Sequence, residues 1–267
     1  MDYSHYRWIR VEKNNQVAIV TLNRPEHRNA AHPEMRAELD RIWPELSEDD
    51  DVSAIVLTGA GKAFCAGGDV KAMASRFGTE QGFAHSTKGV GRARRLCQSM
   101  LDVGPPIVCA INGDAMGLGA TLALLCDVTV MSETARIGDS HVKVGLVAGD
   151  GGAVFWPVLI GPHRAKDFLL RSRVADGSQA HAIGLVNYVV PPDEVLPQAI
   201  AIAEELAAQP KWAVRWTKLS INQALKAQLN LVINTSHALE MLSAQTADHG
   251  EAARAFVDKR QPHFTGK

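Results

Sequence analysis

Short runs of apolar and β-branched residues, each bounded by turn residues, fill the first two thirds of the chain. Residues 8–12 and 16–22 flank Asn14 and Asn15, so the opening segment predicts a β-hairpin that turns at these two asparagines. Further runs of the same kind predict strands at residues 54–58, 106–111 and 127–131.

Between these runs, apolar residues recur at helical spacing. One helix is predicted to begin at Pro33, and Pro44 predicts a kink or an early end. Its apolar face comprises Met35, Leu39, Ile42, Trp43 and Leu46. Helical patterns also cover about residues 82–101 and 117–125. Because strands alternate with helices, we expect an α/β fold with βαβ crossovers and mainly parallel strand pairing.

The pattern changes after Val190, where strand-like runs give way to helical spacing that continues to Asp258. One face of the first helix in this region carries Leu196, Ile200, Ala203 and Ala207. We therefore expect an α/β core over residues 1–195 and a C-terminal helical region over residues 196–267. The second region would cap the core or mediate oligomerisation.

Composition narrows the classes of protein that fit this pattern. The 267 residues are 46% hydrophobic and 21% charged with a net charge of −1, which argues against a general nucleic-acid binder. No stretch approaches the ~20 apolar residues of a membrane span, and residues 1–15 lack the apolar core of a signal peptide. We expect a cytoplasmic protein with no nucleic-acid or membrane partner.

Cysteines and known motifs exclude several chemistries. No CxxC pair occurs, so we expect inert thiols rather than a metal site or disulfides. The run Gly59–Lys62 is not a phosphate loop, because Val56 and Ala63 replace the required glycine and hydroxyl residue. Asp139 and His141 do not make a serine triad with Ser140, because adjacent residues cannot adopt triad geometry.

Two glycine-rich turns share one design. Residues 64–70 and 112–120 each follow a β-like run and lead into a predicted helix, where free N–H groups are exposed. Together the turns could hold a developing O⁻ from two sides, which is how an oxyanion hole works. The same small residues would also allow tight packing of a helix on a strand. Spacing alone leaves the two interpretations evenly balanced.

These turns, with further runs in order along the chain, resemble the crotonase (enoyl-CoA hydratase/isomerase) superfamily from about residue 7 to residue 266. The matching runs are residues 22–25 with 29–30, residues 63–69, residues 110–119 and residues 255–262. The resemblance implies a crotonase-like ββα spiral core with a C-terminal helical region, assembled as a homotrimer or homohexamer. It also implies an acyl-CoA substrate, with coenzyme A as part of the substrate and no tightly bound cofactor or metal.

The resemblance implies roles for individual residues. The N–H groups of Gly68 and Leu118 would hold the thioester oxygen. Coenzyme A would be contacted near Arg28 and Ala30. Its adenine would lie near three residues of the first turn, and Lys259 would meet its phosphates. The three residues are Ala66, Asp69 and Val70.

The chain departs from the family's hydratases at the two catalytic glutamates. Their positions are occupied by Thr121 and His141. Thr121 is expected to contact the substrate, but a threonine hydroxyl cannot act as a base near neutral pH. An imidazole can both take and give protons, and Asp150 could orient it or act as a second acid or base. Asp150 could equally be the N-cap of the following helix.

Three functions remain open. The first is acyl-CoA hydration or isomerisation through an enolate, using unusual residues. The second is hydrolytic cleavage of a C–C bond in a β-keto substrate, because the pair His141 and Asp150 is similar to that of crotonase-fold β-diketone hydrolases of the 6-oxocamphor hydrolase type. The third is non-catalytic acyl-CoA binding.

Overall fold

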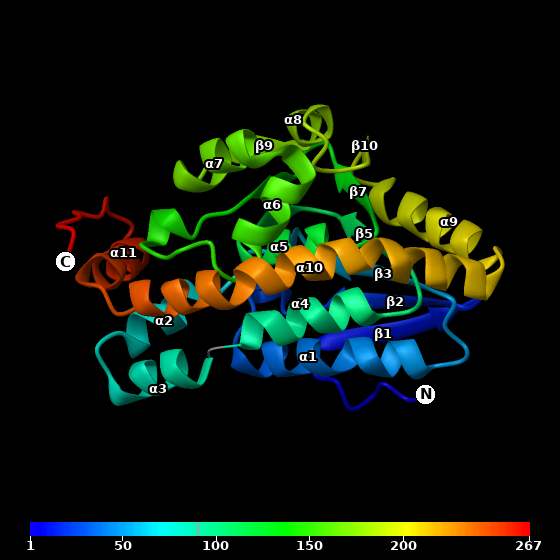
Figure 1. The fold of residues 1–267 in the computed structure, drawn as a ribbon, viewed down its shortest axis with the longest axis horizontal. Coiled ribbons are helices and arrows are strands. Elements are labelled where there is room, and N and C mark those ends of the chain that lie inside the picture. Colours follow the sequence, from blue (N-terminus) through cyan, green and yellow to red (C-terminus); the bar gives the residue numbers. More distant parts are fainter. Residues whose placement is uncertain (90) are drawn as a thin grey trace.

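The computed structural model describes residues 1–89 and 91–267, and it has two β-sheets surrounded by helices (Figure 1). The main sheet has the strand order β1-β2-β3-β5-β7-β10, and all neighbours pair in parallel except β1 and β2. Its strands are β1 (Ile9–Asn14), β2 (Val17–Leu22), β3 (Ala54–Gly59), β5 (Ile107–Ile111), β7 (Val128–Ser132) and β10 (Tyr188–Val190). The predicted α/β class and parallel pairing are confirmed.

The predicted hairpin is confirmed, but its turn lies one residue further along. Asn14 pairs with Val17, so the turn consists of Asn15 and Gln16. Both turn residues have positive φ, 48° and 66°, as a two-residue hairpin turn with the right twist requires. The turn predicted at Asn14 and Asn15 was therefore wrong by one residue.

A second, smaller sheet was not predicted, because its strands have only three residues each. Its order is β4-β6-β8-β9, with β4 parallel to β6 and β6 parallel to β8. The strands are β4 (Ala63–Cys65), β6 (Asp114–Met116), β8 (Arg136–Gly138) and β9 (Val174–Asp176). Each glycine-rich turn leaves one of the two parallel strands β4 and β6.

Helices cover both faces of the main sheet. Along β3, Ile55 and Leu57 point to the larger core, whereas Ala54 and Val56 point to a smaller cluster beneath α9 (Val195–Ala207). The alternation follows from the two-residue period of a strand. The larger core includes side chains of α1 (Pro33–Glu48) and α4 (Arg92–Asp102).

Helix α1 continues through Pro44 to Glu48, so the predicted early end was wrong. A proline in a helix removes one backbone hydrogen bond. The neighbouring side chains Trp43 and Leu46 are fully buried, and this burial offsets the loss.

The segment predicted as helical over residues 82–101 contains two helices, α3 (Glu80–Gly89) and α4; Val90 lies outside the described residues. Helix α2 (Val70–Arg76) begins directly after the first glycine-rich turn, and α5 (Leu118–Leu124) after the second. The remaining short elements are η1 (Pro25–His27), η2 (Val142–Val144), α6 (Gly152–Ile160), α7 (Pro162–Leu170) and α8 (Gly177–Ala182).

The predicted C-terminal helical region is confirmed. It consists of α9, the long helix α10 (Lys211–Ser243) and α11 (Ala247–Asp258). Helix α10 runs the length of the molecule beside α4 and α6, and α11 packs on α2 at one end (Figure 1). The division of the chain at residue 195 stays a prediction.

Three polar side chains near the start of α10 each donate to a backbone carbonyl of the core. They are Arg215 to Val52, Lys218 to Pro105 and Asn222 to Leu101, at 2.7, 2.9 and 2.9 Å. All three donor residues are buried. These bonds fix the helix against the sheet, because buried carbonyls left without partners would be unfavourable.

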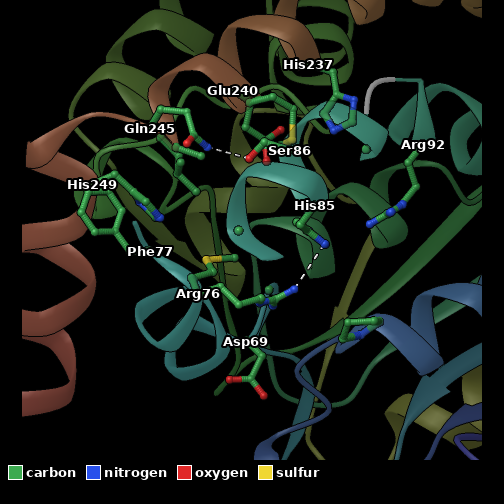
Figure 2. A pocket seen from close by; sticks show the side chains of 18 of the residues that line it. Asp69, Arg76, Phe77, His85, Ser86, Arg92, His237, Glu240, Gln245 and His249 are labelled. Carbon is green, nitrogen blue, oxygen red and sulfur yellow. Dashed lines mark hydrogen bonds between the residues drawn. The ribbon is translucent and has the colours of Figure 1, made fainter. Parts of the chain in front are cut away.

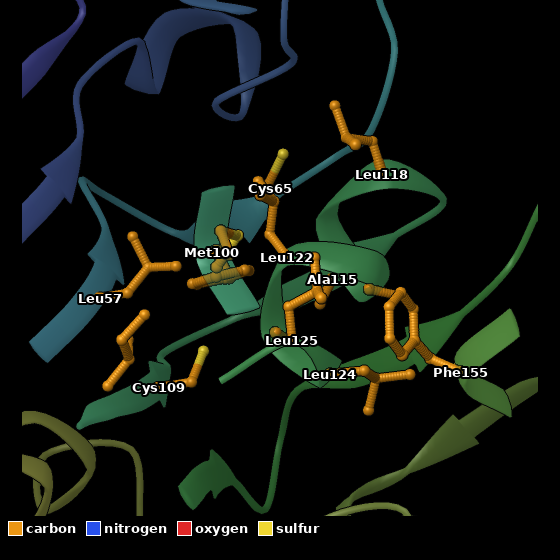
Figure 3. Close-up of a cluster of buried hydrophobic side chains, with 14 of the residues drawn as sticks. Leu57, Cys65, Met100, Cys109, Ala115, Leu118, Leu122, Leu124, Leu125 and Phe155 are labelled. Atoms are coloured by element: carbon orange, nitrogen blue, oxygen red, sulfur yellow. The ribbon is translucent and has the colours of Figure 1, made fainter. Parts of the chain in front are cut away.

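Apolar packing beneath α5 supports the second glycine-rich turn. Leu118 and Leu122 of α5 are buried and belong to the same apolar cluster as Met100 and Phe155 (Figure 3). Because interiors of this kind are close-packed, the start of α5 is held in one position.

The first glycine-rich turn is tied to the preceding loop by the buried side chain of Asn29. Its amide nitrogen donates to the carbonyls of Ala60, Ala63 and Phe64 at 2.9, 2.8 and 3.1 Å. Its amide oxygen accepts from the Arg24 N–H at 2.9 Å. One side chain therefore satisfies four backbone groups around β4.

Replacing Asn29 by Ala should lower the free energy of unfolding by about 2–4 kcal/mol, because buried backbone groups lose their partners. The positive φ of Asn29, 55°, adds strain for alanine. Urea denaturation measures the change. Asn23→Ala is the control, since that side chain makes no hydrogen bond among the described residues. Equal stability of both variants would contradict the assigned role.

Candidate active site

The parallel pairing of β4 with β6 brings the two glycine-rich turns together. A Cβ on Gly67 would lie 2.6 Å from the Met116 carbonyl oxygen and 3.6 Å from the Leu118 nitrogen. A Cβ on Gly119 would overlap the Cys65 carbonyl. Close packing therefore explains Gly67 and Gly119, and it leaves the N–H groups of other turn residues available.

Gly68 and Leu118 supply two such groups. Among the hydrogen bonds of the described residues, neither N–H has a protein acceptor. Gly68 lies in the wall of a cavity, and Leu118 opens helix α5 with its side chain buried. The two predicted donors thus lie on adjoining turns, and neither has a partner in the part of the chain that the structure describes.

His141 lies beside the second turn. A Cβ on Gly117 would come within 3.4 Å of the His141 Cε1, so glycine allows the imidazole to approach. Its Nδ1 is 2.7 Å from Asp139 Oδ1, and its Nε2 is 3.6 Å from Asp150 Oδ2. The predicted pair of His141 and Asp150 is therefore brought together, and Asp139 is an additional partner.

The two carboxylates keep His141 charged. Burial alone would lower the pKa of His141, but the charges of Asp139 and Asp150 outweigh burial and hold that pKa well above its usual range. Burial alone would raise the pKa of Asp150, and the positive charge of His141 reverses the shift, so the pKa of Asp150 is lowered. The two neighbouring carboxyl groups therefore favour the imidazolium form of His141.

Asp150 does not cap a helix. Helix α6 begins at Gly152 with Gly151 as its N-cap, and no side chain caps it. Instead, Asp150 Oδ1 accepts from the Thr121 hydroxyl at 3.4 Å, while Oδ2 has no hydrogen-bond partner in the described structure. The N-cap interpretation is therefore wrong. The free Oδ2 faces His141 and, at 4.0 Å, the guanidinium of Arg36.

A further buried acid, Glu240, was missed by sequence reasoning. It lies on α10, its Oε2 has no hydrogen-bond partner in the described structure, and burial with the nearby charge of Asp150 raises its pKa to about 8. The sequence does contain a pattern that indicates this acid. His237 and Glu240 lie at helical spacing from the apolar Ile233, on one face of a predicted helix. Burial lowers the pKa of His237 to about 4.

Gly68 and Glu240 line one cavity of about 890 Å³, including its open mouth. Its walls come from α1, α2, α3, α10 and the starts of α4 and α11 (Figure 2). The cavity joins the first turn to the buried acid.

Five of the residues predicted to contact coenzyme A gather around the first turn. The Ala66 N–H donates to the Arg28 carbonyl at 2.9 Å, and Arg24 bridges the Ala30 carbonyl and Asp69 at 2.9 and 3.1 Å. The fifth, Val70, begins α2.

Asp69 and Lys259 differ from the other residues predicted to contact coenzyme A. Asp69 also caps α2 by accepting from the Ala72 N–H at 3.2 Å, so it has a structural role. Lys259 follows α11 with a φ of 56°, and its exposed side chain makes no ion pair among the described residues. Among the described residues, Lys259 makes no hydrogen bond or ion pair with the other five.

The cysteines and acids make no metal site. All four cysteines are free, and Cys65, Cys97 and Cys109 are buried; burial raises the pKa of Cys65 to about 11. In residues 1–89 and 91–267, no cluster of metal-binding side chains occurs. Across the same residues, no helix has the length and apolarity to cross a membrane.

Asp139→Asn should lower the pKa of His141, because it removes the nearer of two charges that stabilise the imidazolium. The folded-state pKa lies above that of an unfolded histidine, roughly 6.5. The ion pairs therefore stabilise the fold fully below the unfolded pKa, and this stability is lost as the pH rises through the folded one. An NMR titration of the imidazole carbons measures the shift.

Asp193→Asn, at an exposed site, controls for a change of net charge. A His141 pKa that is the same in the Asp139→Asn variant and the native protein would contradict the assigned ion pair.

Comparisons with known proteins point to one family. A family model described as enoyl-CoA hydratase/isomerase matches residues 12–267. A probable enoyl-CoA hydratase of Mycobacterium tuberculosis is 34% identical over 260 residues, covering 97% of this chain and 98% of that protein. A crotonyl-CoA hydratase of Syntrophomonas wolfei is 31% identical, with 98% and 99% covered.

A solved structure agrees as well. The crystal structure of an enoyl-CoA hydratase/isomerase from Mycobacterium paratuberculosis superimposes with a TM-score of 0.88 at 32% identity, covering 94% of this chain and 99% of that one. The resemblance seen in the sequence is thus confirmed over nearly the whole length. The chain belongs to the enoyl-CoA hydratase/isomerase family of the crotonase superfamily.

Proposed function

We propose that this protein acts on an acyl-CoA thioester by forming an enolate whose oxygen is bound by the N–H groups of Gly68 and Leu118. One observation carries the proposal: two N–H donors without protein acceptors lie on adjoining turns, with His141 against one of them. Donors fixed in advance stabilise developing negative charge, and each contributes about 3–4 kcal/mol to the transition state.

His141 is the proposed proton carrier. Because it is held as an imidazolium, it can give a proton to the α-carbon of an enolate or to a leaving group. Asp150, with its unpartnered Oδ2, is the group that takes a proton. Glu240, which is neutral below about pH 8, adds a carboxylic acid at the cavity that Gly68 lines.

Coenzyme A is proposed to enter as part of the substrate rather than as a held cofactor. The residues around the first turn, Arg28, Ala30, Ala66, Asp69 and Val70, would contact it, as the family resemblance implies. Lys259 would reach the phosphates of coenzyme A bound to a neighbouring subunit. This role of Lys259 needs an oligomer, which we take to be a homotrimer or homohexamer.

Hydrolytic C–C cleavage of a β-keto substrate is the second candidate. The 2.7 Å contact between His141 Nδ1 and Asp139 supports it, because Asp139 orients the imidazolium as a proton donor. Asp150 would take a proton from water, and the resulting hydroxide would attack the keto carbon. The C–C bond would break with its electron pair moving into the enolate held by the two N–H groups, and His141 would then protonate the α-carbon of that enolate.

His141→Ala should lower kcat on crotonyl-CoA by about 10²–10⁴-fold, the usual contribution of general acid–base catalysis. Asp150→Asn should also lower kcat, because it removes the proton acceptor. His181→Ala, an exposed histidine of α8, is the matched control. Full turnover in either site variant would refute the assigned roles.

A 3-ketoacyl-CoA incubated in ¹⁸O-water separates the two reactions. C–C hydrolysis should place the label in a carboxylate product detected by mass spectrometry. Turnover of crotonyl-CoA without any cleaved 3-ketoacyl product would exclude this second candidate. Calorimetric binding of both esters with no turnover of either would instead identify a non-catalytic acyl-CoA-binding protein.

A homotrimer or homohexamer should have three or six times the mass of one chain in multi-angle light scattering. Exposed apolar side chains on α10 support assembly, because large apolar patches are rare on monomers. They are Trp212, Trp216, Ile221 and Leu231. A monomer at micromolar concentration would contradict this proposal.

A further inference from the structure

Basic side chains gather in the part of the cavity formed by α2, α3 and α4. Arg76 ends α2, His85 lies on α3 and Arg92 begins α4. All three line the cavity, and their nitrogen-bearing ends lie toward one another (Figure 2). Arg36 lines the same cavity nearer to Gly68. We call Arg76, His85 and Arg92 the basic cluster.

The basic cluster presents hydrogen-bond donors to the cavity. Arg76 Nε donates to the Ala72 carbonyl at 2.8 Å, and Arg76 Nη1 lies 3.2 Å from His85 Nδ1. Because a guanidinium only donates, the His85 Nδ1 must accept, which makes His85 neutral with a hydrogen on Nε2. Burial and the neighbouring arginines lower the pKa of His85 to about 4, in agreement with this tautomer.

The two arginines of the cluster have no ion-pair partner among the described residues. Neither Arg76 nor Arg92 lies within 4.0 Å of a carboxylate among the described residues. The acid beside the first turn, Asp69, is paired with Arg24 at 3.1 Å. Asp40 is near Arg92 without forming an ion pair, and burial raises its pKa.

Two other acids in this region do not pair with the arginines of the cluster either. Asp150 lies against His141, and Glu240 is neutral below about pH 8. Half-buried arginines without a counter-charge are unfavourable unless an anion joins them. Burial lowers the pKa of Arg92, and the positive charge of Arg36 lowers it further, so the region is short of negative charge.

We propose that the basic cluster binds a carboxylate at the far end of the acyl chain, so that the substrate is the mono-CoA thioester of a dicarboxylic acid. This inference rests on the proposed function, because it takes Gly68 as the site of the thioester carbonyl. The planar guanidinium of Arg92 matches a carboxylate, and the Nε2–H of His85 adds a neutral donor.

The anion is assigned to the acyl chain rather than to the phosphates of coenzyme A. The residues proposed to contact coenzyme A lie in the loop after η1 and around the first turn, where the Ala66 N–H donates to the Arg28 carbonyl. The basic cluster lies beyond Gly68, in the cavity shared with Glu240. A thioester carbonyl at Gly68 therefore directs the acyl chain, not the nucleotide, toward the arginines.

The test compares 2-enoyl-CoA esters that differ only in a terminal carboxylate. The pairs are hex-2-enoyl with 5-carboxypent-2-enoyl, and pent-2-enoyl with 4-carboxybut-2-enoyl. We expect kcat/KM to be about tenfold to a hundredfold higher for the carboxylated member of at least one pair, the usual range for charged hydrogen bonds. Equal kcat/KM values, or a preference for the neutral members in both pairs, would overturn the inference.

Variants link this preference to the cluster. The double variant Arg76→Gln/Arg92→Gln should lose the preference, and Arg92→Lys should keep part of it, because lysine retains the charge without the planar fork. Arg94→Gln, on the same helix but exposed and outside the cavity, should keep all of it. A preference that survives the double variant would overturn the assignment to the cluster.

Two further measurements test the preference without a variant and separate a carboxylate ligand from a phosphate ligand. Calorimetry of the native protein with adipyl-CoA and hexanoyl-CoA measures the preference without any variant, and tighter binding of adipyl-CoA is expected. Pantetheine thioesters, which lack the nucleotide phosphates, should show the same preference. Loss of the preference with pantetheine would assign the arginines to phosphate and overturn the inference.

Failure of the proposed function has a different signature from failure of this inference. Turnover of neutral esters without any preference for a carboxylate overturns only the dicarboxylic substrate. Absence of turnover with all four CoA esters, together with no calorimetric binding of either saturated thioester, would overturn the proposed function and the inference resting on it.

Discussion

The candidate site depends on the parallel pairing of two three-residue strands, β4 and β6. Parallel strands deliver the segments that follow them to the same edge of a sheet, so two turns far apart in sequence become neighbours. The positive φ of Gly67 and Gly117, 89° and 52°, lets the backbone reverse without a side chain between the turns. Because backbone N–H groups are covalently fixed, their direction is set as soon as these strands pair.

Charge is divided between two regions of the site. Around His141, the charges of Asp139 and Asp150 are met by the imidazolium and by Arg36, while Glu240 stays protonated at neutral pH. The group is close to electrically neutral, which makes its burial tolerable. Toward α2, α3 and α4, positive charge is left without such compensation. An acyl chain that spans the two regions would have its reacting end in a neutral environment and its far end in an electropositive one.

Much of the architecture could be predicted from the sequence. The hairpin, the buried strands and the C-terminal helices have strong periodic patterns, and glycine marked both turns because few other residues allow such backbone contacts. The short strands β8 and β9 have three residues each, too few for a period to be detected. Pro44 shows that tertiary burial can override a local helix breaker.

The site was predicted in part for similar reasons. His141 and Asp150 could be singled out because they occupy positions that the family resemblance marks. Glu240 could not, because its importance comes from packing of α10 over the loop that carries Gly149, where a Cβ would come within 2.8 Å of Glu240 Oε2. Arg76 belongs to a polar segment, and Arg92 belongs to a basic run with Arg94 and Arg95 that the sequence favours as a solvated helix face. The structure instead places Arg92 in the cavity wall, and its proximity to Arg76 depends on how α2 and α4 are placed.

Helix α10 has a mechanical consequence for the site. At about 1.5 Å per residue, its 33 residues form a rod roughly 50 Å long. The three side chains near its start that bond to core carbonyls fix both its axial position and its rotation. A slip of one residue would turn Glu240 by about 100°, away from the cavity. The position of Glu240 toward one end of α10 is therefore aligned by bonds made at the other end, and loosening those distant bonds would misplace this acid without touching it.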